Sequence, residues 1–82
     1  MNVDRELARH VLEVGFNSGR LLEDLIPLIQ NHCQKKESEQ YIKAIASVLA
    51  EIGLEIFSKI YDQYPDLKKE VEDKVQRYGK FL

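Results

Sequence analysis

Apolar residues recur at alternating steps of three and four along residues 3–33 and predict one long amphipathic helix. At about 100° per residue, they fill an arc of roughly 200°. One neighbouring helix cannot cover so wide an arc, so the pattern predicts contacts with two helices. The arc consists of two adjacent rows: Leu7, Val11, Val14, Ser18, Leu21, Leu25, Leu28 and His32 form the first, and Ala8, Leu12, Gly15, Gly19, Leu22, Ile26, Ile29 and Cys33 form the second.

Two features inside this stretch could interrupt the helix. Phe16-Asn17-Ser18-Gly19 has the composition of a turn. The apolar arc nevertheless keeps its phase across these residues, which favours a helix that continues from an N-cap at Asn2. Pro27 removes a hydrogen bond to the carbonyl of Glu23, so we expect a bend there, with a short second helix near Pro27 as the alternative.

The remainder of the chain predicts two more helices, at residues 39–63 and 66–78. A short polar connector and an N-cap at Ser38 make the second helix an antiparallel neighbour of the first. Pro65 ends it, and Gly79 is the expected C-cap of the third helix. The second helix carries a main apolar face of Tyr41, Ile45, Val48, Leu49, Ile52, Ile56 and Ile60, and a far ridge of Ala50, Leu54, Phe57 and Tyr61. The third helix offers Leu67, Val71, Val75 and Tyr78 as a cover for that ridge.

These elements predict an all-α fold in a single helical domain spanning residues 1–82. Its architecture is a long antiparallel helical hairpin plus a short C-terminal helix. A chain of 82 residues has a marginal core. We therefore expect dimerisation to complete the helical bundle.

Composition and charge narrow the function classes. Twelve basic side chains against fourteen acidic ones do not make the basic excess of a nucleic-acid-binding surface. The longest apolar stretch is interrupted by charged residues, so we expect no membrane span. A single cysteine allows no intrachain disulfide and is typical of a reducing compartment, which predicts a cytoplasmic location.

Candidate chemistry gathers around His32 and Cys33 at the end of the first helix. Adjacent helical residues point about 100° apart and do not readily share one metal ion. No oriented base accompanies the thiol, so Cys33 is interpreted as an inert buried side chain. Glu6, His10 and Glu13 share one polar side and are interpreted as a solvated face. We expect no catalytic residue, no metal site and no cofactor.

Small residues at Gly15, Ser18 and Gly19 open a notch in the middle of the apolar arc. Either a partner helix crosses closely there, or a large side chain of the same chain, such as Tyr41 or Phe57, fills the notch. The first alternative predicts an interface that comprises Val11, Gly15, Ser18, Gly19, Leu22, Leu25 and Ile29.

The sequence therefore favours a non-enzymatic helical protein-interaction module, a homodimeric four-helix-type bundle acting as a small adaptor or regulator. Its expected partners are a second copy and another helical protein. One alternative is a small helical DNA-binding regulator that reads duplex DNA with the third helix. The other is a thiol- or metal-dependent protein that uses Cys33 and His32.

Overall fold

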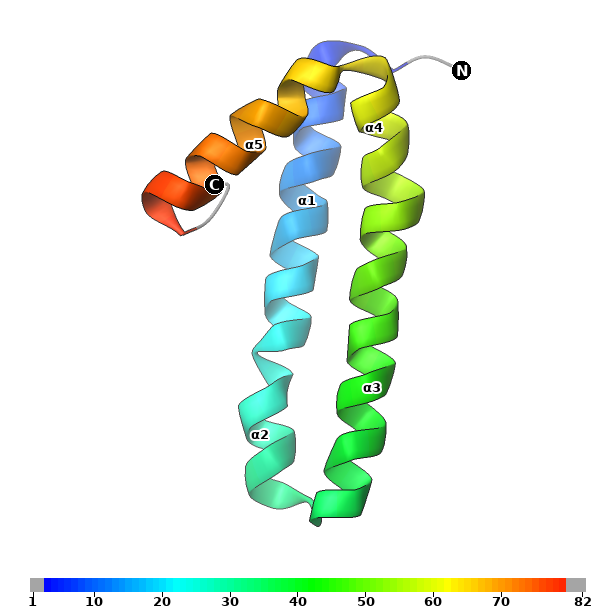
Figure 1. Cartoon of the computed structure of the whole chain (residues 1–82), viewed down its shortest axis with the longest axis vertical. Coiled ribbons are helices and arrows are strands. Elements are labelled where there is room, and N and C mark those ends of the chain that lie inside the picture. The colour runs from blue at the N-terminus through cyan, green and yellow to red at the C-terminus, as the bar shows by residue number, and fades with distance from the viewer. Residues whose placement is uncertain (1–2, 80–82) are drawn as a thin grey trace.

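The computed structural model describes residues 3–79 and contains no strand within them, which confirms the all-α prediction. Its elements are α1 (Arg5–Glu23), α2 (Leu25–His32), α3 (Lys35–Glu51), a π-helical turn η1 (Ile52–Phe57), α4 (Ser58–Gln63) and α5 (Pro65–Tyr78). Figure 1 shows α1 and α2 forming one rod, with α3, η1 and α4 forming a second rod alongside it that runs in the opposite direction. We call these two rods the helix pair. From its upper end, α5 crosses α1 and leads away from the pair.

The first rod differs from the single helix that the sequence predicts. The predicted N-cap Asn2 lies outside the described residues, and Asp4 caps α1 by accepting a hydrogen bond from the Leu7 amide at 2.8 Å. The helix is continuous through residues 17–19, as its apolar phase predicts. It is interrupted at Asp24, however, and Pro27 then occupies the first turn of the eight-residue α2. A proline is tolerated there because the first turn has no intrahelical acceptors for its amides.

The connector between the rods is shorter than predicted. Gln34 is the N-cap of α3, so the helix begins at Lys35 and takes in residues 35–37. The expected cap, Ser38, is instead a buried residue of the first helical turns. Its hydroxyl donates to the Ile29 carbonyl at 3.3 Å and lies 3.5 Å from that of Cys33, satisfying the C-terminal end of α2.

A π-turn in the second rod corrects the prediction that this helix has two separate apolar faces. The Ser58 amide donates to the carbonyl of Gly53, five residues back rather than four. The extra residue rotates the following turns, so that Phe57 takes the inward place and Ile56 is 43% exposed. One inward row therefore continues across η1, and it comprises Ile42, Ile45, Leu49, Ile52, Phe57, Ile60 and Tyr64.

The main buried core lies where α5 meets the helix pair. Leu67 and Val71 of α5 pack with Ala8, Leu12 and Ile60, and each is at most 5% exposed. The expected cover over the ridge of the second helix is found in part: Phe57 and Tyr61 are packed against the core, but Leu54 is 68% exposed. The predicted ends of the helices hold here, since Tyr64 separates α4 from Pro65 and Gly79 caps α5 with φ of 74°.

Candidate functional site

Polar contacts fix α5 over one face of the helix pair. Arg5 forms an ion pair with Asp66, and Arg9 makes a bidentate ion pair with Glu70 at 3.0 and 3.1 Å. Hydrogen bonds from the two arginines hold the pKa values of both carboxyl groups below their usual range. The Tyr64 hydroxyl adds a hydrogen bond to the Val3 carbonyl at 2.7 Å. We call this side of the pair the covered face.

The notch at Gly15 and Gly19 is filled by side chains of the same chain. A Cβ atom added at Gly15 would overlap the ring of Phe57, and one added at Gly19 would lie 3.2 Å from Leu49. The Phe57 ring stacks on Phe16 with the ring centroids 4.7 Å apart. The small residues therefore allow the two rods to approach each other closely. Of the two interpretations of the notch, the structure supports the intrachain one.

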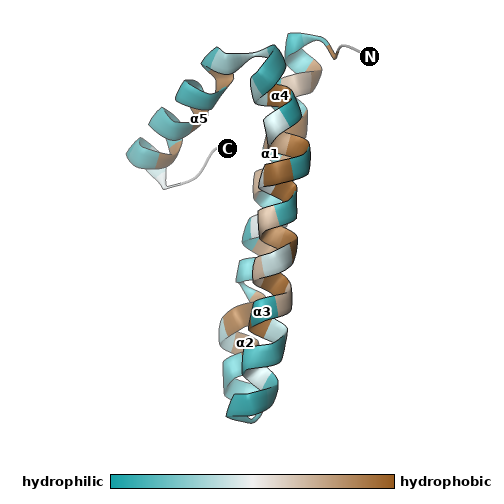
Figure 2. Ribbon diagram, turned by 45° about the vertical axis from the view of Figure 1, so that its right-hand side comes forward, coloured by the Kyte–Doolittle hydropathy of each residue, from teal (hydrophilic) through white to brown (hydrophobic). Residues whose placement is uncertain are grey.

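An exposed apolar row runs along each rod on the side away from α5. On α1 the row includes Val14 and Leu21, which are 50% and 69% exposed. On the second rod it includes Val48, which is 49% exposed. Figure 2 shows hydrophobic segments along most of the helix pair. The complete set of exposed residues in these rows is Leu7, Val14, Leu21, Leu25, Leu28, Tyr41, Val48 and Ile56.

The two exposed rows belong to the same face of the molecule. In both rods each exposed residue immediately precedes an inward one, as Val14 precedes Gly15 and Val48 precedes Leu49. Two antiparallel helices are related by an approximate two-fold axis normal to the plane that contains them. Residues that directly precede an inward residue therefore lie on the same face in both rods. Residues that follow the inward row, such as Arg9 and Phe16, lie on the covered face. We call the side that carries the exposed rows the open face.

The predicted interface residues are divided between the interior and the open face. Gly15 and Gly19 pack inside the chain, and Val11 contacts the core. The side chains of Ser18 and Leu25 are exposed. Leu22 and Ile29 are partly buried, and each directly follows an exposed leucine. The sequence pattern contains the exposed row but does not distinguish it from the inward row, because both rows are apolar.

The dimensions of the chain show how much surface remains uncovered. The Cα trace measures 45 × 29 × 15 Å, and beyond the reach of α5 the molecule consists of the helix pair alone (Figure 1). Its accessible surface is 6274 Å², against about 5,100 Å² for a compact monomer of this mass. The excess of roughly 1,200 Å² exceeds the roughly 800 Å² that each partner contributes to a standard protein interface.

A groove on the covered face separates the C-terminal end of α5 from the helix pair. Its volume is about 270 Å³, and its lining includes Phe16, Phe57 and Val75, with Arg20 and Glu23 among its polar residues. The groove exists because the C-terminal part of α5 diverges from the pair (Figure 1), and along this helix Val71 is buried whereas Val75 is 37% exposed.

The residues proposed for thiol or metal chemistry are not assembled into a site. Burial raises the pKa of the Cys33 thiol and a contact with Glu37 raises it further, which disfavours the reactive thiolate. His32 is exposed. Among residues 3–79, no three His, Cys, Asp or Glu side chains lie close enough together to hold a metal ion.

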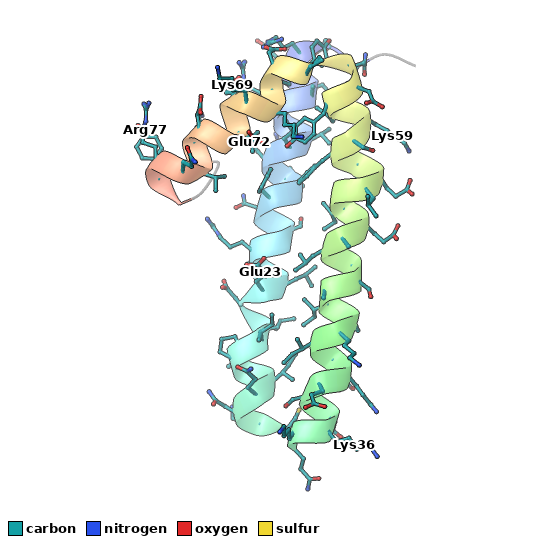
Figure 3. All side chains as sticks on the ribbon, in the orientation of Figure 1. Glu23, Lys36, Lys59, Lys69, Glu72 and Arg77 are labelled. Atoms are coloured by element: carbon teal, nitrogen blue, oxygen red, sulfur yellow. The ribbon has the colours of Figure 1, made fainter. Side chains whose placement is uncertain are left out.

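The outer surface of α5 bears on the DNA-binding alternative. Asp66 and Glu70 point towards α1, where the two arginines engage them. The exposed charges that remain on α5 are of both signs: Lys68, Lys69, Glu72, Asp73, Lys74 and Arg77. Figure 3 shows Arg77 at the far end of α5, away from the helix pair. This mixture lacks the one-signed surface that phosphate contacts require.

Across the described part of the chain, no helix has the length and apolar character needed to cross a membrane. Comparisons with models of known protein families, with curated proteins and with solved structures gave no significant match.

Proposed function

We propose that the protein is a non-enzymatic helical interaction module that associates through its open face. Two copies would bury these faces against each other as a homodimeric four-helix-type bundle. In this role the chain acts as a small adaptor or regulator, and another helical protein is the second kind of partner that the face suits. The observation that carries the proposal is the set of exposed apolar side chains along the same face of both rods.

The energetic argument rests on the size of this face. Burying an exposed leucine side chain contributes about 1.5–3 kcal/mol, and five leucine or valine side chains of the first rod lie on the open face. Helical domains bury their apolar faces between two layers of secondary structure. The helix pair supplies one layer, and α5 covers only part of the opposite side. A second helical layer would complete the core.

Sedimentation equilibrium over micromolar concentrations tests the proposal directly. We expect a dimer for the natural chain and a monomer for Leu21→Glu, because the substitution places a charge in the centre of the open face. Leu54→Glu is the matched control: Leu54 is 68% exposed against 69% for Leu21, but it lies away from the open face. This variant should remain a dimer.

A monomeric mass for the natural chain would refute the proposal. Equal weakening by the two substitutions would place the contact elsewhere. Circular dichroism of each variant establishes that the helices are retained.

A further inference from the structure

We infer that the apolar groove on the covered face is closed by the C-terminal residues of the same chain, with the Phe81 side chain seated between the end of α5 and the helix pair. Residues 80–82 lie outside the described residues, and the last described residue, Gly79, itself lines the groove. The groove lies on the opposite side of the helix pair from the open face. The inference is therefore independent of the proposed association.

The lining of the groove is largely apolar. Phe16 and Phe57 contribute to it from the helix pair, where their rings stack with the centroids 4.7 Å apart. From α5 it receives Val75, which is 37% exposed although Val71, one turn earlier on the same helix, is 3% exposed. The last apolar position of the α5 stripe is thus only partly covered by the helix pair, and an apolar side chain in the groove would complete its burial.

The C-cap of α5 connects the groove to the residues that follow. Gly79 has φ of 74°, and its amide donates to the Val75 carbonyl at 2.8 Å. In this left-handed cap the chain turns out of the helix direction, and an apolar residue after the glycine commonly packs on the last turn of the helix. Because the acceptor residue Val75 lines the groove, the groove is where such a contact would form.

Reach and side-chain chemistry select Phe81 as the occupant. Phe81 follows Gly79 by two residues, so the Cα atoms of these residues are at most about 7 Å apart. A phenylalanine ring suits a groove lined by aromatic rings, because aromatic pairs attract each other at centroid distances of about 4.5–7 Å. Arg20 and Glu23 also line the groove and carry opposite charges, so the lining favours neither an acidic nor a basic occupant.

The short connection favours this segment over an occupant from another molecule. A segment joined to its site by a short linker has an effective concentration in the millimolar range. That value exceeds the micromolar concentrations at which a second copy would compete. The groove is consequently filled within one chain, whether or not the open face is associated.

Nuclear Overhauser measurements on the full chain test the inference directly. We expect contacts from the Phe81 ring to the Val75 methyl groups and to the rings of Phe16 and Phe57. An isotope-filtered experiment on an equimolar mixture of labelled and unlabelled chains separates contacts within a chain from contacts between chains. The contacts of Phe81 should be absent from the interchain spectrum.

Hydrogen exchange of a variant gives a second measurement. In Phe81→Ala, the amides of residues 74–77 should exchange about tenfold faster, because partial burial of one aromatic side chain stabilises that turn to this extent. The amides of residues 8–12, in the core, should be unaffected. Tyr78→Ala is the matched control, since Tyr78 is 63% exposed and does not line the groove. It should change the same rates by no more than about twofold.

Two results would overturn the inference. Contacts of Phe81 found only between chains would assign the groove to the C-terminal segment of a second copy. No contacts, together with unchanged exchange in Phe81→Ala, would leave the groove to a different occupant. Neither result affects the test of the open face, because that test depends on the sedimenting mass and on Leu21.

Discussion

The two faces of the helix pair are built from similar apolar residues but differ in how far those residues are buried. On the covered face, Leu12 is completely buried, and α5 is held by two ion pairs and by the packing of Leu67 and Val71 in the core. On the open face, Leu21 of the same helix is 69% exposed. Both leucines belong to the single apolar arc of the first helix, but Leu12 lies in the row that packs against the second rod and α5, whereas Leu21 lies in the exposed row.

The comparison also separates the two ends of the molecule. Five of the six buried apolar residues among those described belong to the cluster near α5. In contrast, α2 contributes no fully buried residue, and the part of the pair beside it has only two helices. A two-helix layer exposes one side of each rod to solvent unless another layer covers it. The molecule thus has a conventional core at one end and a surface suited to association along one face.

The sharpest test of this comparison is truncation of the same side chain on the two faces. Leu12→Ala should lower the free energy of unfolding by about 2–5 kcal/mol because it leaves a cavity in the core. Leu21→Ala, studied at concentrations where the chain is monomeric, should change it by less than about 0.5 kcal/mol. Urea denaturation followed by circular dichroism measures both values. Equal losses would show that the two leucines have similar surroundings.

The close approach of the rods predicts a smaller effect at the glycines. Gly15→Ala should cost about 1–3 kcal/mol, because the new methyl group collides with Phe57. Gly53→Ala is the matched control, since nothing lies within 4 Å of its added Cβ. It should stabilise the helix by up to about 1 kcal/mol. Thermal denaturation of the two variants reports the difference, and similar stabilities would contradict the contact between Gly15 and Phe57.

The buried Ser38 hydroxyl beside the connector contributes to stability about as much as one hydrogen bond. Ser38→Ala should destabilise the fold by about 0.5–1.5 kcal/mol, because the Ile29 carbonyl loses the hydroxyl and keeps only the Cys33 amide as a donor. Ser18→Ala, at an exposed helical position, should be neutral or slightly stabilising. Chemical denaturation of both variants provides the measurement. A neutral Ser38→Ala would indicate that water replaces the hydroxyl.

The ion pairs that hold α5 predict the smallest effect, and it depends on pH. The Arg9 guanidinium lowers the pKa of Glu70 from its ordinary value of 4.5. The folded state therefore binds the proton less readily than the unfolded state. The resulting stabilisation is complete above about pH 4.5 and disappears as the pH falls through the lower pKa of the folded protein. Solvent screening keeps this contribution below those of the preceding substitutions.

Glu70→Gln should consequently be less stable than the natural chain at pH 7 and should converge with it in acid. Exposed Glu39→Gln serves as the control and should show no such convergence. Denaturation midpoints across the pH range provide the comparison. A difference that is independent of pH would assign the effect of Glu70 to packing.

The sequence by itself determined the helical class and several helix ends. Period-three-to-four spacing identifies helices because it reflects the helix repeat itself. Tyr64 before Pro65 and Gly79 after Tyr78 act through backbone conformation within a few residues. The continuity of α1 through Asn17 and Gly19 followed from the phase of the apolar arc. All of these features depend on local chemistry.

Only the tertiary structure decided which apolar row faces inward and where α5 docks. Two apolar rows of similar hydrophobicity give no local preference, and the row with Gly15 and Gly19 faces inward because its small residues admit Phe57 and Leu49. The π-turn at Ile52–Phe57 gives up regular helical hydrogen bonds in exchange for packing against the other rod. Ser38 exchanges its expected capping role for contacts with α2. Each outcome depends on residues distant in sequence, and neither helical periodicity nor capping chemistry contains that information.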